Sequence, residues 1–294
     1  MKLKSSTLLL AFGSALFLSV SCSNDAKEGA LSDSAKDSLT VSGIKIKDQN
    51  FMVPSPMILA EMIKKSGALY DKKMMNPVAS LSSYSDGFKQ GLNLGVYGAD
   101  LGYITMYENT GDAMEYYKTV VQLGNSLKIT GSFDDKLMKR FNANIGRKDS
   151  ILSLVGDAYR RSDNFLRKGD QDDIAALILA GGWIESTWFA LKIYKDKPNQ
   201  NVAVRIGEQK GTASGILKVL MDLNKPELES LIKLFSDLNN VYQNVEIKYS
   251  FAEPTTDEGK HLTIINGTTD VKITSEQLIE LTAKVAAVRN FIIN

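Results

Sequence analysis

Residues 87–107 read GFKQGLNLGVYGADLGYITMY and carry the pattern on which the expected fold depends. Each glycine inside a helix costs about 1 kcal/mol relative to alanine, so a segment this rich in glycine needs a compensating interaction. A second helix packed at unusually short distance would supply it, because only glycine lets two backbones come so close. We therefore expect a core helix over about residues 80–107. Its glycines are spaced four, four, three and four residues apart and share one helix face: Gly87, Gly91, Gly95, Gly98 and Gly102.

Helical periodicity recurs along the chain from residue 51 onward. Gly181-Gly182 marks a helix with room for a close neighbour, and Gly207, Gly211 and Gly215 predict a second glycine face. Thr274-Ser-Glu-Gln277 matches a capping box at the start of the last helix. The other expected helices cover about residues 55–67, 112–127, 134–144, 149–167, 170–194, 199–222, 226–242 and 275–292.

The period changes from helical to alternating near the C-terminus. Residues 245–251 and 261–265 alternate apolar and polar side chains, which predicts a β-hairpin, and residues 271–273 could add a short third strand. The whole pattern predicts a mainly α fold. We expect a single compact domain of about nine helices over residues 51–294, with a small β-hairpin before the C-terminal helix.

The composition excludes several classes of protein. Among 294 residues, 44% are hydrophobic and 23% charged, which is ordinary for a globular domain. Lys and Arg total 35 against 34 Asp and Glu, so the charge gives no reason to expect a nucleic-acid partner. One Cys and one His exclude a disulfide scaffold and a zinc site with several Cys or His ligands. No motif for a cofactor or another metal site is present, and we expect neither.

The N-terminus has the features of an export signal. Lys2 and Lys4 precede an apolar run at residues 8–20, which is too short to span a bilayer as a helix. We expect a signal peptide over residues 1–21. Residues 22–50 are rich in Ser, Asp, Lys and Gly, lack the apolar content of a core, and are expected to form a flexible tether.

The string Leu18-Ser-Val-Ser-Cys22 ends the apolar run and contains the only cysteine of the chain. It resembles a bacterial lipobox of the Bacteroidota type, with Ser19 where Leu is usual. The resemblance implies that Cys22 is acylated, becomes the first residue of the mature chain and anchors it to a membrane. In the lipoproteins that this chain resembles, an Asp after the Cys favours the inner membrane, so the resemblance with Ser23 at that place implies the outer membrane, with the domain facing the periplasm. The alternatives are a free thiol or an ordinary signal peptide cut nearby.

Two acidic residues stand in strongly apolar segments. Asp100 lies between Tyr97 and Tyr103, and Glu185 follows Trp183. A buried carboxylate is costly unless it is paired, so a polar ligand site between helices, lined by these aromatics, is one interpretation. The alternatives are a satisfied buried network that fixes helix register, or an exposed position. The expected hydrogen-bonding or charged partners are tyrosine hydroxyls or an arginine: Tyr97, Tyr103, Tyr107, Arg140, Arg147 or Arg205.

Both segments also resemble parts of a family of uncharacterised helical lipoproteins of Bacteroidota. The similar strings are Tyr97-Gly-Ala-Asp-Leu and Gly181-Gly-Trp-Ile-Glu, and the resemblance covers most of residues 51–194. It implies a helical fold and a lipid-anchored location. It implies no reaction.

These observations predict a lipid-anchored envelope protein that binds a partner protein or a small ligand and is not an enzyme. The alternative is an envelope hydrolase acting on glycan or peptidoglycan, with Asp100 and Glu185 as general acid and base. A purely structural role in an envelope assembly is a third hypothesis. His261, the only histidine, lies in an expected strand with no nucleophile motif nearby, so we expect a surface residue there.

Overall fold

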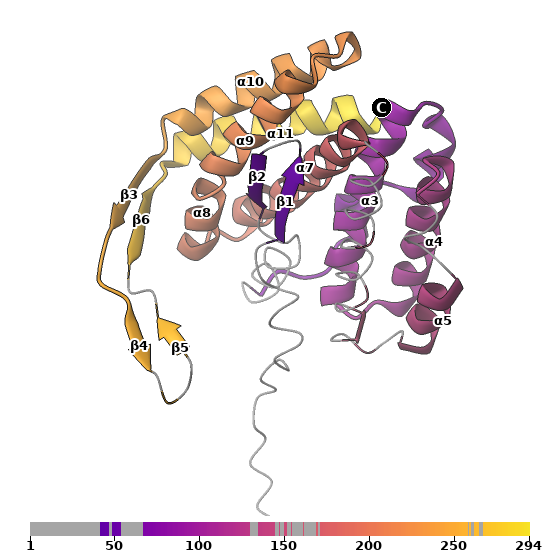
Figure 1. Ribbon diagram of the computed structural model, residues 1–294, viewed down its shortest axis with the longest axis horizontal. Helices are drawn as coiled ribbons and strands as arrows, with labels where there is room; N and C mark the ends of the chain where they lie inside the picture. Colours follow the sequence, from indigo (N-terminus) through magenta and orange to yellow (C-terminus); the bar gives the residue numbers. More distant parts are fainter. Residues whose placement is uncertain are drawn as a thin grey trace, which may run out of the picture. The chain divides into compact units, whose positions relative to one another are not determined.

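Helices dominate the computed structural model, as the sequence predicts. It describes residues 42–46, 49–53, 67–129, 135–144, 171–257, 262–264 and 267–294, and the single positions 147, 150, 151, 154, 161, 169 and 259. Figure 1 shows the order of the elements along the chain. The α-helices of the described residues are α3 (Gly87–Met106), α4 (Thr110–Ser126), α5 (Asp135–Asn144), α7 (Asp172–Asp196), α8 (Gln200–Gly207), α9 (Lys210–Leu223), α10 (Glu229–Gln243) and α11 (Ser275–Ile293).

Short 3-10 helices precede two of these α-helices. Asp86, and not a residue near 80, caps α3, because its side chain accepts a hydrogen bond from the Lys89 amide. The capping box expected at Thr274 and Gln277 is present at the start of α11. The expected helix at 55–66 and most of the one at 149–167 lie outside the described residues. The 3-10 helices are η1 (Lys72–Met74), η2 (Val78–Ser83) and η4 (Pro226–Leu228).

The close contact predicted for the glycine helix is formed between α3 and α7. A Cβ atom added to Gly95 would lie 2.0 Å from the carbonyl oxygen of Ile178, and one added to Gly181 would lie 1.9 Å from that of Leu92. Non-bonded atoms do not approach so closely, so neither position could carry a side chain. The two backbones can touch because both residues are glycine. The stripe is not uniform, however, since a Cβ at Gly87 would meet nothing within 4 Å.

The second predicted glycine face is not a continuous helix face. The segment expected as one helix over residues 199–222 divides into α8 and α9. Gly207 ends α8, where an added Cβ would collide with the Val271 side chain at 2.5 Å. Gly211 is exposed and has no neighbouring atom within 4 Å of an added Cβ. The spacing of four residues was therefore insufficient to predict packing here, because it spans a break between helices.

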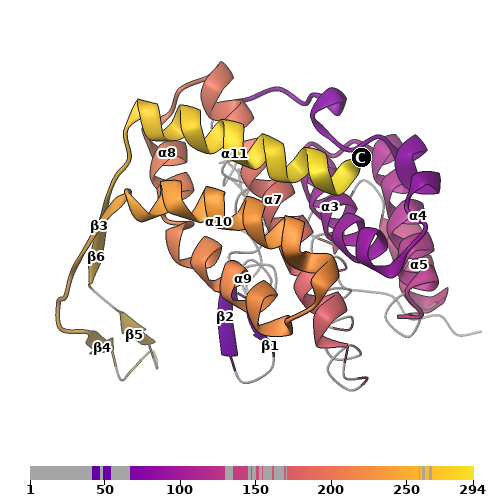
Figure 2. The ribbon, with the colours of Figure 1, turned by 90° about the horizontal axis from the view of Figure 1, so that it is seen from above.

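Helix α7 lies between two clusters of buried apolar side chains and contributes to both. Trp183 and Ile184 pack with residues of α8 to α11, whereas Phe189 and Ile193 pack with residues of α3 and α4. Figure 2 shows α11 and α10 side by side, and α11 also contacts α7. By length and composition α7 could cross a membrane, but 78% of its most apolar window is buried. Its apolar character is that of a helix covered by protein on all sides.

Strand pairing near the C-terminus differs from the expected hairpin. The strand β3 (Glu246–Ser250) pairs antiparallel with β6 (Thr268–Lys272), and not with residues 261–265. This register places Val271 opposite Ile247 and buries it with Val245 at the base of the ribbon. The small β-sheet before α11 is thus confirmed with a different partner strand, while His261 lies outside the described residues. The inner strands, β4 (Thr255–Asp257) and β5 (Leu262–Ile264), pair with each other.

The end of the expected tether is also partly structured. Strand β1 (Ser42–Ile46) pairs antiparallel with β2 (Gln49–Val53), although residues 22–50 were expected to be coil. The alternation of Ile44 and Ile46 with polar residues accounts for the strand. Cys22 and the rest of the expected signal and tether lie outside the described residues.

Because the two backbones touch, even a methyl group at Gly95 should strongly lower the stability of the protein. Gly95→Ala should lower the free energy of unfolding by at least about 3 kcal/mol, because its methyl group would overlap the α7 backbone. Gly87→Ala is the matched control in the same helix and should be neutral or stabilise by up to about 1 kcal/mol. Urea unfolding of both variants measures the difference. A Gly95→Ala protein as stable as the parent would contradict the contact.

Candidate functional site

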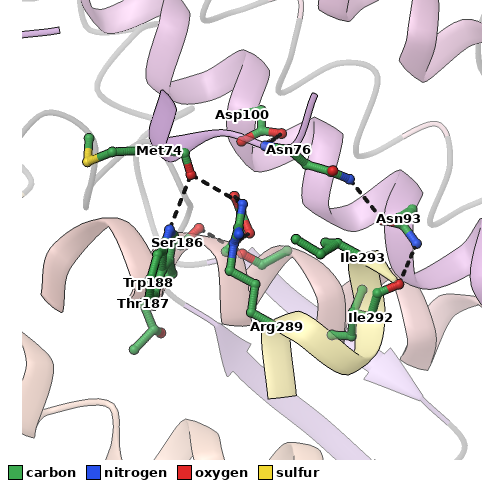
Figure 3. Close-up of polar contacts among 12 residues, drawn as sticks. Met74, Asn76, Asn93, Asp100, Ser186, Thr187, Trp188, Arg289, Ile292 and Ile293 are labelled. Carbon is green, nitrogen blue, oxygen red and sulfur yellow. Dashed lines mark hydrogen bonds and ion pairs between the residues drawn. The ribbon is translucent and has the colours of Figure 1, made fainter. Parts of the chain in front are cut away.

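The two acidic candidates, Asp100 of α3 and Glu185 of α7, meet in the interior beside Arg289 of α11. Figure 3 shows Asp100 and Arg289 converging from their separate helices. Both carboxyl groups are fully buried, at 0% exposure, and Arg289 is 7% exposed. We call Asp100, Glu185 and Arg289 the buried triad.

Glu185 and Arg289 form a two-pronged ion pair. Arg289 Nε donates to Glu185 Oε2 at 2.6 Å, and Arg289 Nη2 donates to Oε1 at 2.7 Å. The same Nη2 also donates to the Met74 carbonyl at 3.2 Å, and the guanidinium lies 5.1 Å from the centre of the Trp188 ring. Charged hydrogen bonds in this geometry are among the strongest in proteins, and they compensate for removing both charges from water.

Asp100 has fewer partners than Glu185. Its Oδ2 accepts a hydrogen bond from the backbone N–H of Asn76 at 3.3 Å, and its Oδ1 has no donor among the described residues. Burial and the negative charge of Glu185 raise the pKa of Asp100 well above its ordinary value. Burial also raises the pKa of Glu185, but the charge and hydrogen bonds of Arg289 oppose that rise.

The charges of the triad indicate which of its two carboxyl groups is protonated. The triad holds two carboxyl groups and one guanidinium, so it is neutral only if one carboxyl group keeps its proton. Glu185 is held ionised by Arg289, which leaves Asp100 as the protonated group. The protonated carboxyl group of Asp100 then donates a hydrogen bond to the Glu185 carboxylate.

Further hydrogen bonds hold the segment next to the triad, residues 74–76, in place. The Asn76 side-chain amide donates to the Tyr84 hydroxyl at 2.9 Å and to Asn93 Oδ1 at 3.1 Å. The Tyr116 hydroxyl donates to the Asn76 carbonyl at 2.9 Å. Asn93 also donates to the Ile292 carbonyl near the end of α11 (Figure 3). Residues 74–76 are thereby tied to α3, α4 and α11.

The other three candidate residues do not join the triad. The Tyr97 hydroxyl donates to the Pro77 carbonyl at 2.8 Å, and the Tyr103 hydroxyl accepts from the Asp71 amide at 2.9 Å. Trp183 faces the apolar cluster formed with α8 to α11, where its indole N–H donates to Gln209 at 3.0 Å. The five residues therefore do not line one common site.

The charged partner of the acids was missed in the sequence. Arg205 pairs with Glu208 at the surface, and Arg140 and Arg147 are exposed. The observed partner, Arg289, lies four residues after Val285 and three before Ile292, within the apolar stripe of α11. An arginine on a buried stripe is the signal that could have identified it.

The arrangement favours a structural role over a catalytic one. A general acid must reach its substrate, and here both carboxyl groups have no exposed surface and hydrogen-bond inside the triad. Among the described residues, no group of three or more His, Cys, Asp or Glu side chains could hold a metal ion. The triad matches the interpretation of a buried network that fixes how three helices pack.

Comparison of the chain with protein-family models, with curated proteins and with solved structures finds no match. The resemblance to helical lipoproteins of Bacteroidota stays a prediction from the quoted strings.

The protonation assignment predicts unequal effects of two isosteric changes. Glu185→Gln should lower the free energy of unfolding by about 3–5 kcal/mol, because it leaves the buried Arg289 without its counter-charge. Asp100→Asn replaces a group that is neutral in the folded protein with a neutral amide and should raise the free energy of unfolding at pH 7, because the amide avoids the cost of taking up a proton that the unfolded chain has released. Denaturant titrations at pH 7 measure both values. A loss of stability in Asp100→Asn would mean that Asp100 is ionised.

The raised pKa of Asp100 also predicts a pH dependence. The unfolded chain releases this proton near pH 4, whereas the folded protein keeps it. The stabilisation is therefore complete below the unfolded pKa and decreases as pH rises toward the folded pKa. Between pH 5 and 7, the parent should lose up to about 1.4 kcal/mol per pH unit relative to Asp100→Asn. Unfolding free energies of both proteins across this range provide the measurement, and parallel curves would contradict it.

Proposed function

We propose that this protein is a lipid-anchored, non-enzymatic interaction module of the bacterial cell envelope. The observation that carries the proposal is the position of Cys22, the only cysteine, directly after a basic flank and a 13-residue apolar run. Acyl chains on Cys22 would hold the mature chain on a membrane. By the same resemblance to lipoproteins, Ser23 favours the outer membrane, with the domain in the periplasm. The proposed partner of the domain is an envelope protein or a small ligand.

The geometry of the acidic residues supports the non-enzymatic part of the proposal. An envelope hydrolase would need two carboxyl groups in an open cleft that admits a glycan. Asp100 and Glu185 are fully buried, and Glu185 is paired with Arg289, so neither is placed to act on a substrate. The hydrolase hypothesis loses the only residues proposed to perform its chemistry.

Removal of the acylated thiol tests the anchor. Cys22→Ala, exported through an ordinary cleavable signal peptide in place of residues 1–21, should move from the membrane fraction to the soluble fraction. The reason is that acyl chains on Cys22 are the proposed means of attachment. Fractionation followed by mass spectrometry of the N-terminal peptide measures location and acylation together.

Ser21→Ala in the native chain is the matched control and should stay acylated and membrane-bound. A parent protein that carries no acyl group on Cys22 would overturn the anchor, as would full membrane retention of Cys22→Ala.

A further inference from the structure

The β-ribbon before α11 presents apolar side chains to solvent. We call residues 246–272 the arm, of which the structure describes 246–257, 259, 262–264 and 267–272. Figures 1 and 2 show it leaving the helices beside α8 and extending away from them. Three side chains at alternate positions become more exposed toward the far end of the arm: Ile247 at 37%, Tyr249 at 60% and Phe251 at 68%.

The base of the arm is firmly held by the helical body. Val245 and Val271 are buried, and both lie against Gly207 at the end of α8. The Lys210 ammonium donates to the carbonyls of Gln243 and Val245, each at 2.9 Å. The apolar face of the arm is thus an outward continuation of the hydrophobic core.

The opposite face of the ribbon is charged but balanced. Lys248 lies 2.8 Å from Glu246, and Lys272 lies 3.8 Å from the same carboxylate. Asp270 is the cross-strand partner of Lys248, so two cations and two anions share this face. Along β3 and β6, the arm therefore has one apolar side and one hydrated side without net charge.

We propose that the apolar face of the arm inserts into the headgroup region of the lipid bilayer. This inference rests on the proposed lipid anchor at Cys22. Twenty residues connect Cys22 to Ser42, where β1 begins, and as coil they would reach about 25 Å. A domain of this size measures on the order of 45 Å across, so the tether keeps its surface next to the bilayer.

The size and chemistry of the face favour lipid over a protein partner. A stable protein interface takes about 20–30 residues from each side, whereas the exposed large apolar side chains among the described residues of the arm are three. For a domain already tethered to the bilayer, membrane insertion is an intramolecular step and needs few contacts. Tyr and Phe suit the boundary between headgroups and acyl chains. Residues 246–272 contain five acidic and three basic residues, a net charge of −2, so binding should require no anionic lipid.

Tryptophan fluorescence of the acylated mature protein in vesicles tests the proposal. The vesicles are zwitterionic phosphatidylcholine, with brominated or unmodified acyl chains. Phe251→Trp places the probe one residue beyond β3, in line with Ile247 and Tyr249, and Ser250→Trp places it on the charged face at the end of β3. After subtraction of the parent signal, the probe at 251 should lose about half of its emission to bromine, and the probe at 250 little.

Three results would contradict the proposal, and they differ in which part of it they refute. Equal emission from both variants in brominated and unmodified vesicles would overturn the insertion of the arm. Chemical cross-linking of the arm to a second copy or to another protein would also overturn it, because a protein would then cover this face. Failure of the parent to float with vesicles, together with an unacylated N-terminal peptide, would instead refute the anchor and thus the proposed function.

Discussion

The fold depends on the direct contact between the backbones of α3 and α7. Gly95 on one helix lies so close to the backbone of Ile178 and Gly182 on the other that a side chain at position 95 would overlap it. This contact also determines where the acids lie. Asp100 follows Gly95 by five residues and Glu185 follows Gly182 by three, so helices that touch at their glycines bring both carboxyl groups into the same interior region. The glycine stripe and the acidic residues are therefore one feature of the structure.

The buried triad converts this contact into a specific arrangement of three helices. Apolar packing alone tolerates small sliding movements of one helix along another, whereas a two-pronged ion pair with short hydrogen bonds does not. Arg289 bonds to Glu185 and to the Met74 carbonyl at the same time. These bonds fix the rotation of α11 about its own axis and its position along that axis relative to α7. Losing one partner leaves an uncompensated charge, so alternative packings of these helices are strongly disfavoured.

Local features of the fold could be predicted from sequence, and distant pairings could not. Helix periodicity and capping residues identified α4, α7, α10 and α11, because each depends on neighbours a few residues apart. The pairing of Glu185 with Arg289 joins residues 104 positions apart, and its local trace, an arginine on the buried stripe of α11, does not identify the partner. The partner of β3 was assigned to the wrong strand for the same reason, since alternation defines a strand and not its register. Asp100 and Glu185 were identified because acids are rare in such apolar segments.

The position of Arg289 in the chain has a consequence for the order in which the protein can fold. During synthesis or export from the N-terminus, α3 and α7 emerge well before α11. Until then the Glu185 carboxylate has no cation to face, and closing the glycine contact would bury it without a counter-ion. We therefore expect the contact between α3 and α7 to be less favourable before α11 is present. If the chain is exported as proposed, this order would keep it open for transport until α11, which carries the counter-charge, has emerged.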